Sequence, residues 1–277
     1  MSSTITWSGT LTALSSISHS GESRGLSTML RREQVFDPDS GNLVPVPIIS
    51  GNSFRGILRR IGEDQLRDVL DYDGKLSAAA AHALRGGGTL AKVNGEPLSG
   101  SRLATLRRLV PQIGVFGAAG GGRIIEGCLQ VGKVIPHLRE TRNITGVNIN
   151  RSAFDAVQIE TYTRVDDSQS HSFVAVDDAP DQDTASQQML YRIETYPAGT
   201  TFSTWITLTR PTDLELAYFA DILDTFAQSG TLGGRKAVGL GRVRSNLTCN
   251  TDLPDIDWRS QVAAGRDDAL AALEDLA

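Results

Sequence analysis

Six segments of the chain show clear hydrophobic periodicity, and their order limits the folds that the chain can adopt. Alternating apolar and polar residues predict strands, and apolar residues three or four positions apart predict helices. Along the chain these segments are strand 4–17, helix 50–70, strand 123–135, strand 197–210, helix 214–228 and strand 242–249. This is the order of elements in a split βαβ (ferredoxin-like) unit. We therefore expect an α+β protein built on one such unit.

Four further segments lie outside these six. Residues 19–47 form a long loop between the first strand and the first helix, and a loop of this length is usually either functional or disordered. Residues 75–110 are rich in alanine and are expected to form a small helical insertion, whereas residues 139–191 have the composition of a long polar hairpin. We expect one domain over residues 1–250, followed by an acidic tail with one helix at 251–277.

The first helix begins in the sequence IISGNSFRGILRR at residues 48–60. On a helical wheel, an apolar arc that includes Phe54 and Leu58 lies opposite Arg55 and Arg59. The serine and asparagine residues at its start can cap the helix, so free backbone N–H groups and the positive end of the helix dipole lie beside these arginines. This combination suits phosphate groups. An ordinary amphipathic helix with a solvated basic face is the alternative interpretation.

The charges of the chain are unevenly distributed. The net charge is −5, but residues 1–151 carry 18 Lys and Arg against 12 Asp and Glu, whereas residues 152–277 carry 9 against 20. Of the 27 basic residues 23 are arginine, which binds phosphate through two N–H groups at once. A basic half and an acidic half would also let identical copies associate head to tail.

Composition predicts a soluble, cytoplasmic protein. An apolar content of 40% in 277 residues is enough for a sizeable core, and no segment resembles a signal peptide or a membrane-spanning helix. Cys128 and Cys249 each lie in a strand-like segment, so we expect buried free thiols in a reducing compartment.

The glycine-rich segment 230–241 does not fit a dinucleotide-binding loop. Such a loop lies between a strand and a following helix, whereas this segment follows a helix and enters a strand. Its glycines allow another polymer to approach Arg235 and Lys236 closely. A plain glycine-rich turn is the alternative interpretation.

We expect no metal site and no cofactor. The four histidines and two cysteines lack the spacing of metal ligands, and the aspartates at 177–183 lie in a polar segment around a proline, which is typical of a solvated loop. His19 follows the first strand and could act as a general acid or base in RNA cleavage. Alternatively, it is a loop histidine that contacts the backbone or RNA.

Three motifs together resemble the RAMP superfamily of CRISPR-associated RNA-binding proteins. They are SGNSFRGILR at 50–59, VFG at 115–117 before a glycine run and a strand, and GGRKAVGLGRV at 233–243. The resemblance spans most of residues 1–250 and does not cover the tail. Within the superfamily, the chain is most similar to the backbone subunit of effector complexes, in its type IV version.

This resemblance implies an RRM-like (ferredoxin-like) palm, helical fingers at 75–110 and a thumb at 139–191. It also implies a non-catalytic subunit that forms a helical filament on guide RNA (crRNA), in a ribonucleoprotein for antiviral defence. Its partners would be the guide RNA, target nucleic acid paired to the guide, further copies of the chain and other effector subunits, with no membrane. The RNA-binding residues expected are Arg24, Arg31, Asn52, Ser53, Arg55, Arg59, Arg123, Arg142, Arg235 and Lys236. The thumb residues expected to wedge between nucleotides are Phe173 and Val174.

One departure from related subunits argues against target cleavage. Relatives that cut target RNA carry an aspartate in the loop after the first strand, whereas the matching segment 27–36 holds arginines and Glu33 but no aspartate. Two other functions stay open. One is an RNA endonuclease, acting through His19 on the guide or through Glu33 or Asp37 and a metal ion on the target. The other is an α+β interaction protein unrelated to RNA.

Overall fold

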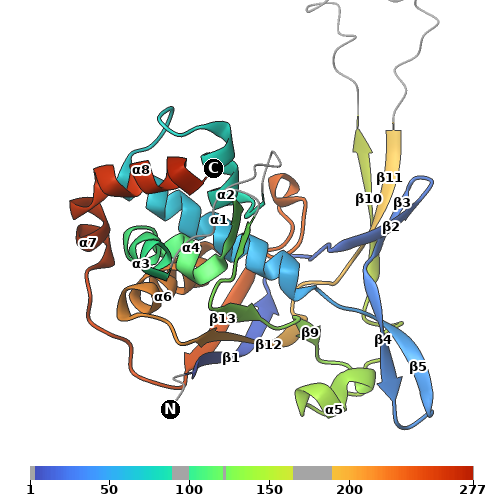
Figure 1. Cartoon of the computed structure of the whole chain (residues 1–277). Coiled ribbons are helices and arrows are strands. Elements are labelled where there is room, and N and C mark those ends of the chain that lie inside the picture. Colours follow the sequence, from blue (N-terminus) through green and yellow to red (C-terminus); the bar gives the residue numbers. More distant parts are fainter. Residues whose placement is uncertain (1–3, 89–99, 121–122, 165–188, 277) are drawn as a thin grey trace, which may run out of the picture.

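The computed structural model describes residues 4–88, 100–120, 123–164 and 189–276, and over these ranges the chain is α+β, as predicted (Figure 1). At its centre lies an antiparallel sheet in the order β13-β1-β12-β8, with β9 also paired to β12. The strands of this central sheet are β1 (Thr4–Ala13), β8 (Leu129–Val131), β9 (Ile135–Pro136), β12 (Thr201–Thr209) and β13 (Val243–Cys249). The first strand therefore lies between two strands from the last third of the chain.

The two faces of the central sheet carry different side chains, because successive residues of a strand point to opposite faces. In β1, Trp7 and Leu11 are buried, whereas the positions between them carry serine, threonine and glycine. The register pairs Trp7 with Ile206 and Leu11 with Phe202, both of which are also buried. One face is therefore the apolar core, and the other is lined with hydroxyl groups.

Helices cover the apolar face. They are α1 (Gly51–Leu70), α2 (Ala78–Arg85), α3 (Gly100–Leu109), α4 (Pro111–Phe116), α6 (Asp213–Ser229), α7 (Trp258–Ala264) and α8 (Arg266–Leu276), and elsewhere lie α5 (Arg142–Thr145) and the short 3-10 turns η1 (Arg139–Thr141) and η4 (Lys236–Val238). The ring of Phe54 in α1 lies 5.0 Å from that of Phe226 in α6, and Phe219 of α6 lies 5.4 Å from Trp7 in β1. These aromatic contacts join α1, α6 and the sheet into one core.

Gly62 lies within α1, where a glycine predicts a weak point in the helix. As predicted, α1 continues past it to Leu70. A Cβ atom at Gly62 would lie 2.5 Å from the Tyr218 hydroxyl and 2.6 Å from Ile222. The glycine therefore permits the close approach of α1 and α6.

The helix predicted in the acidic tail is present as two helices, α7 and α8. Trp258 is buried, packs edge-on against Tyr218 at 4.8 Å, and donates its indole N–H to Asp221 at 2.9 Å. Leu273 and Leu276 of α8 are also buried. Residues 258–276 thus form part of the helical layer, and no helix of the described ranges is long and apolar enough to cross a bilayer.

A second sheet and a hairpin project away from the helical layer (Figure 1). The sheet has the order β10-β11-β3-β2, formed by β2 (Ser20–Arg24), β3 (Ser27–Leu30), β10 (Gln158–Arg164) and β11 (Met189–Thr195), and β4 (Arg32–Asp37) pairs with β5 (Asn42–Pro47). The prediction of a loop over 19–47 is therefore wrong. β2 pairs with β3 and β4 pairs with β5 within the segment, and β3 also runs parallel to the distant β11, pairing Ser27 with Arg192. β2 is exposed along its whole length, so it lacks the apolar alternation that predicts a strand.

The long strand predicted at 123–135 is interrupted. Its residues lie in β7 (Arg123–Ile125), which pairs with β6 (Ala118–Gly120), and then in β8 and β9. At Gly127 a Cβ atom would overlap the backbone of Val115 and Gly117, so the chain turns there against the end of α4. The neighbouring Cys128 and the distant Cys249 are partly buried free thiols, and burial raises the pKa of Cys128 to about 12.

Two glycines of α1 give a matched test of this packing. We expect Gly62→Ala to lower the free energy of unfolding by about 1–3 kcal/mol, because the new methyl group overpacks the contact with α6. Gly56→Ala should instead raise it by about 0.5–1 kcal/mol, because the nearest atom to its Cβ is 3.7 Å away and alanine favours a helix. Urea denaturation measures both changes, and equal effects at the two positions would contradict this account.

Candidate functional site

The residues that follow β1 form a meeting point of three segments that are distant in the sequence. The Arg31 N–H donates to the His19 carbonyl at 2.8 Å, and the Gly234 N–H donates to the Ser18 carbonyl at 2.8 Å. The Ser50 N–H donates to His19 Nε2 at 3.3 Å. This Ser18–His19 junction therefore brings together the arginine-containing segment before α1, the start of α1 and the glycine-rich loop.

The imidazole of His19 is an acceptor at this junction, which requires that Nε2 carries no proton. Burial lowers the pKa of His19, the positive charge of Arg31 lowers it further, and the carboxylate of Glu33 opposes these effects. The ring is therefore neutral at neutral pH, with its acceptor nitrogen occupied by the backbone of Ser50.

The start of α1 is capped as predicted. The Ser50 hydroxyl accepts the backbone N–H of Ser53 at 3.2 Å, and no acidic residue lies in the first turn. Asn52 is exposed and Ser53 is partly buried. The positive end of this helix dipole is therefore left without a carboxylate from its own first turn.

One turn further along α1, Arg55 and Arg59 reach the end of α4. Arg59 is only 5% exposed, and its guanidinium donates to the carbonyls of Ala83 at 3.3 Å, Phe116 at 2.9 Å and Gly117. Arg55 is half-buried and donates to the same Phe116 carbonyl. Carbonyls at the end of a helix lack partners within it, so the two arginines satisfy the end of α4.

Neither arginine forms an ion pair with any described residue. They line a pocket of about 550 Å³ whose lining includes Gly87, Phe116 and Glu126. Burial and, to a smaller extent, the nearby charge of Arg55 lower the pKa of Arg59 to about 10, and burial also lowers the pKa of Arg55, so both side chains keep their charge at neutral pH. The Nε of Arg59 is buried without a hydrogen-bond partner in the described structure. The pocket has the charge that an anion requires.

A second group of arginines lines a pocket of about 490 Å³ between β2, β3 and β4. Arg32 is held by Glu194 of β11 through two contacts, at 2.8 and 3.1 Å, and Arg24 lies 3.3 Å from Glu22. Arg31 is exposed and makes no ion pair within the described residues. Of the three, Arg31 is thus the arginine that can bind an external anion without losing a partner.

The glycine-rich loop presents Arg235 and Lys236 at the surface. Arg235 has a φ of 63°, and its guanidinium lies 5.2 Å from the centre of the Tyr191 ring, a cation–π contact. Tyr191 in turn stacks on Tyr162 at 5.5 Å. The loop is therefore attached to the β10–β11 ladder, and Lys236 beside it is exposed.

The remaining predicted RNA-binding residues do not lie at this junction. Arg142 forms an ion pair with Asp39 in the turn of the β4–β5 hairpin, and Arg123 begins β7. Phe173 and Val174 fall outside the described residues.

The acidic residues considered for metal-dependent cleavage are engaged locally. Glu33 forms an ion pair with Lys133. Asp37 accepts hydrogen bonds from the Ser40 hydroxyl at 2.9 Å and from the Asp39 N–H at 3.2 Å, within its own turn. Within the described ranges, no group of three metal-binding side chains occurs.

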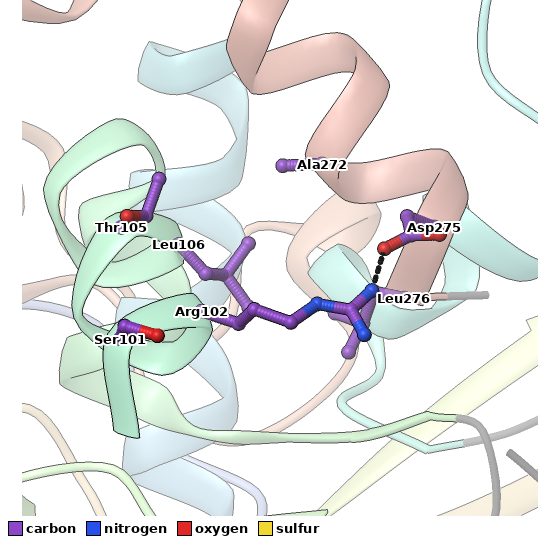
Figure 2. A pocket seen from close by; sticks show the side chains of 7 residues that line it. All are labelled: Ser101, Arg102, Thr105, Leu106, Ala272, Asp275 and Leu276. Carbon is purple, nitrogen blue, oxygen red and sulfur yellow. Dashed lines mark hydrogen bonds and ion pairs between the residues drawn. The ribbon is translucent and has the colours of Figure 1, made fainter. Parts of the chain in front are cut away.

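Another hollow, of about 250 Å³, lies between α3 and α8 (Figure 2). In Figure 2 the side chain of Arg102 extends from α3 toward Asp275, with which it forms an ion pair. Because the arginine and the aspartate of its lining neutralise each other, this hollow is a less suitable anion site than the Arg55–Arg59 pocket.

Sequence reasoning missed the groups that organise the arginines. The Phe116 and Gly117 carbonyls belong to the backbone and have no side-chain pattern. The partner of Arg235, Tyr191, lies in the predicted hairpin. The contact between Tyr191 and Arg235 could be recognised only after the strand pairing that brings these two residues together was known.

A family model described as the RAMP superfamily matches residues 10–244, which include the whole Ser18–His19 junction and the Arg55–Arg59 pocket. The chain belongs to the RAMP superfamily. The RAMP resemblance inferred from the three motifs is thereby confirmed.

A solved structure extends this result. The RAMP chain is similar to a chain of a structure entitled "Type IV-B CRISPR Complex", with 31% sequence identity and a TM-score of 0.64. The similarity covers 93% of this chain and 99% of the other. A comparison with curated protein sequences gave no significant match.

The two arginines of α1 differ in their expected effect on stability. Arg59→Ala should lower the free energy of unfolding by about 2–4 kcal/mol, because it leaves buried carbonyls without donors. Arg55→Ala should cost less than about 1 kcal/mol, because Arg59 still donates to the Phe116 carbonyl. Urea denaturation of the free protein distinguishes them, and equal losses would refute the structural role of Arg59.

The neutral His19 predicts a dependence of stability on pH. A histidine whose pKa is lowered by folding stabilises the protein above its ordinary pKa, and this contribution is lost as the pH falls below about 6.5. We expect the urea midpoint of the wild type to decrease between pH 7 and pH 5, and His19→Ala to reduce the decrease. Burial also lowers the pKa of His137, so part of the decrease should remain. An unchanged pH profile in His19→Ala would contradict this account.

Proposed function

We propose that this chain is a backbone subunit of a type IV CRISPR effector complex that binds guide RNA through its phosphates. The observation that carries the proposal is the similarity to a chain of a type IV-B CRISPR complex over nearly the full length of both chains, at 31% identity. A similarity confined to the sheet would support a shared fold alone.

The geometry of the junction supports phosphate as the ligand. Arg31 and Lys236 are exposed, and within the described residues Arg55 makes one hydrogen bond, to a backbone carbonyl. All three lie in the segments that the Ser18–His19 junction brings together. Binding phosphates without reading bases suits a subunit that must accept any guide sequence.

The predicted residues then take different parts in binding. Arg31, Arg55, Arg235 and Lys236, with Asn52 and Ser53 at the start of α1, contact the RNA backbone. Arg59 acts by holding α4 beside the pocket. Arg24 lines the same pocket as Arg31, whereas Arg123 and Arg142 bind further along the RNA, outside the junction.

We also propose the palm, fingers and thumb of such subunits for this chain. The order β13-β1-β12-β8, with α1 and α6 on one face, is the strand order of a ferredoxin-like palm and supports that assignment. The fingers are α2 and α3, and the β10–β11 ladder is the base of the thumb. Phe173 and Val174 stay our proposal for the wedge.

Copies of the subunit associate head to tail along the guide in this proposal, together with other effector subunits, and present the bases for pairing with target nucleic acid. The supporting observation is the charge distribution, because the basic first half and the acidic second half can attract each other between copies. Electron microscopy of the chain co-expressed with a guide RNA tests this directly. Filaments whose length increases with the length of the RNA are expected. Single subunits that carry no RNA after co-expression would refute the proposal.

The phosphate contacts predict a change in salt dependence. The double variant Arg55→Ala and Lys236→Ala should weaken binding equally for RNAs of different sequence and reduce the slope of log affinity against log salt by about 0.7 for each lost contact. Arg259→Ala is the matched control, because Arg259 is paired with Asp221 in the helical layer.

Fluorescence anisotropy with labelled RNA at several salt concentrations measures the slope. If the double variant keeps the wild-type slope, these residues do not contact phosphate.

A further inference from the structure

The face of the central sheet opposite the helices carries an unusual set of side chains. Among the described residues of β1, β8, β12 and β13, Arg244 is the one charged residue, and no acidic residue occurs. Positions on this face include Ser8, Thr10 and Thr248, which are exposed or partly exposed. One large side chain lies among them: Trp205, which is 47% exposed.

The ring of Trp205 lies flat on the sheet. A Cβ atom built on Gly132 would lie 2.7 Å from the indole Nε1 and 2.8 and 2.9 Å from the two carbons bonded to it. A point almost equally close to three adjacent ring atoms lies above the ring face, because a point beyond the ring edge would be clearly farther from the two carbons. One face of the indole therefore covers Gly132, and the other faces solvent.

This arrangement leaves the indole available for contact. Its N–H makes no hydrogen bond to a described residue, and the directly opposite residue in β1 is the small, exposed Ser8. An exposed aromatic ring on the open face of an antiparallel sheet is a surface on which nucleobases stack.

One residue on the same face of the sheet as the ring also lines the Arg55–Arg59 pocket. Gln130 is part of the lining of the Arg55–Arg59 pocket, and in the sheet it pairs with Thr207, two residues along β12 from Trp205. Side chains two residues apart on a strand share a face, so Gln130 lies on the same face of the sheet as the indole ring.

We propose that Trp205 is a base-stacking site on the open face of the central sheet, where one nucleobase of a single strand stacks on the indole. The proposal rests on the proposed RNA binding and adds a base contact to the proposed phosphate contacts. A protein partner is the competing occupant, because tryptophan is frequent at the centre of protein interfaces. The surroundings favour a base: the four strands expose no second large apolar side chain with which an interface core could form.

Intrinsic fluorescence gives a direct test, because Trp205 is the exposed one of the three tryptophans. Trp7 and Trp258 are 5% and 4% exposed. Titration of the full chain with oligoadenylate should quench the fluorescence, whereas the same strand with abasic sites should quench it far less. Trp205→Phe should lose the quenching signal and keep most of the affinity, because a smaller aromatic ring remains.

Affinity measurements complete the test. Trp205→Ala should weaken oligoadenylate binding about tenfold, with an unchanged salt slope because no phosphate contact is lost. Leu253→Ala, at an exposed apolar position outside the sheet, is the control and should bind like the wild type. Circular dichroism of each variant verifies its fold.

Three results would overturn the proposal, and they are distinguishable. Salt-dependent RNA binding with no quenching and no effect of Trp205→Ala refutes the stacking site and leaves the proposed function standing. Absence of salt-dependent binding in every protein refutes both. A fluorescence change that follows protein concentration without RNA, together with a lower oligomeric state in Trp205→Ala, assigns the face to a second copy of the chain.

Discussion

The arrangement of the candidate site depends on one buried charge. Arg59 enters the interior from the middle of α1 and donates to backbone carbonyls of α2 and of the end of α4. Burying the charge of Arg59 without these acceptors would cost free energy of folding. The contacts therefore fix the positions of three helices relative to one another. They also determine where Arg55 lies, because both arginines share the Phe116 carbonyl. The Arg55–Arg59 pocket therefore depends on the hydrogen bonds that stabilise the buried charge of Arg59.

Much of the fold could be predicted from the sequence, because its main elements have strong local signals. The Ser50 cap of α1 and the Thr212 cap of α6, with Glu215 completing a capping box, are encoded within four residues. The strands at 19–47 were missed, since β2 is exposed along its whole length and β5 along half of it, so they lack the apolar alternation that predicts a strand. Arg59 was predicted to bind RNA phosphate from the polar face of α1, since the wheel of one helix cannot show that other helices cover it.

The candidate site was predicted in part for the same reason. Residue types and helix starts pointed to Arg31, Arg55 and Lys236. The meeting of their segments depends on backbone hydrogen bonds of Ser18 and His19, which no side-chain pattern records. The exposed ring of Trp205 was likewise hidden in a strand pattern, because alternation alone does not say which face of a sheet remains uncovered.

The position of β1 in the central sheet has a consequence for biosynthesis. Within the described residues its strand partners are β12 and β13, which begin at residues 201 and 243. When the ribosome has released the first strand, roughly two hundred residues must still be made before either partner exists. Pairing over such a separation is slow, and the unpaired edges are prone to aggregate in the meantime. Shielding of the nascent N-terminal strand is therefore a requirement for a good yield of the folded protein.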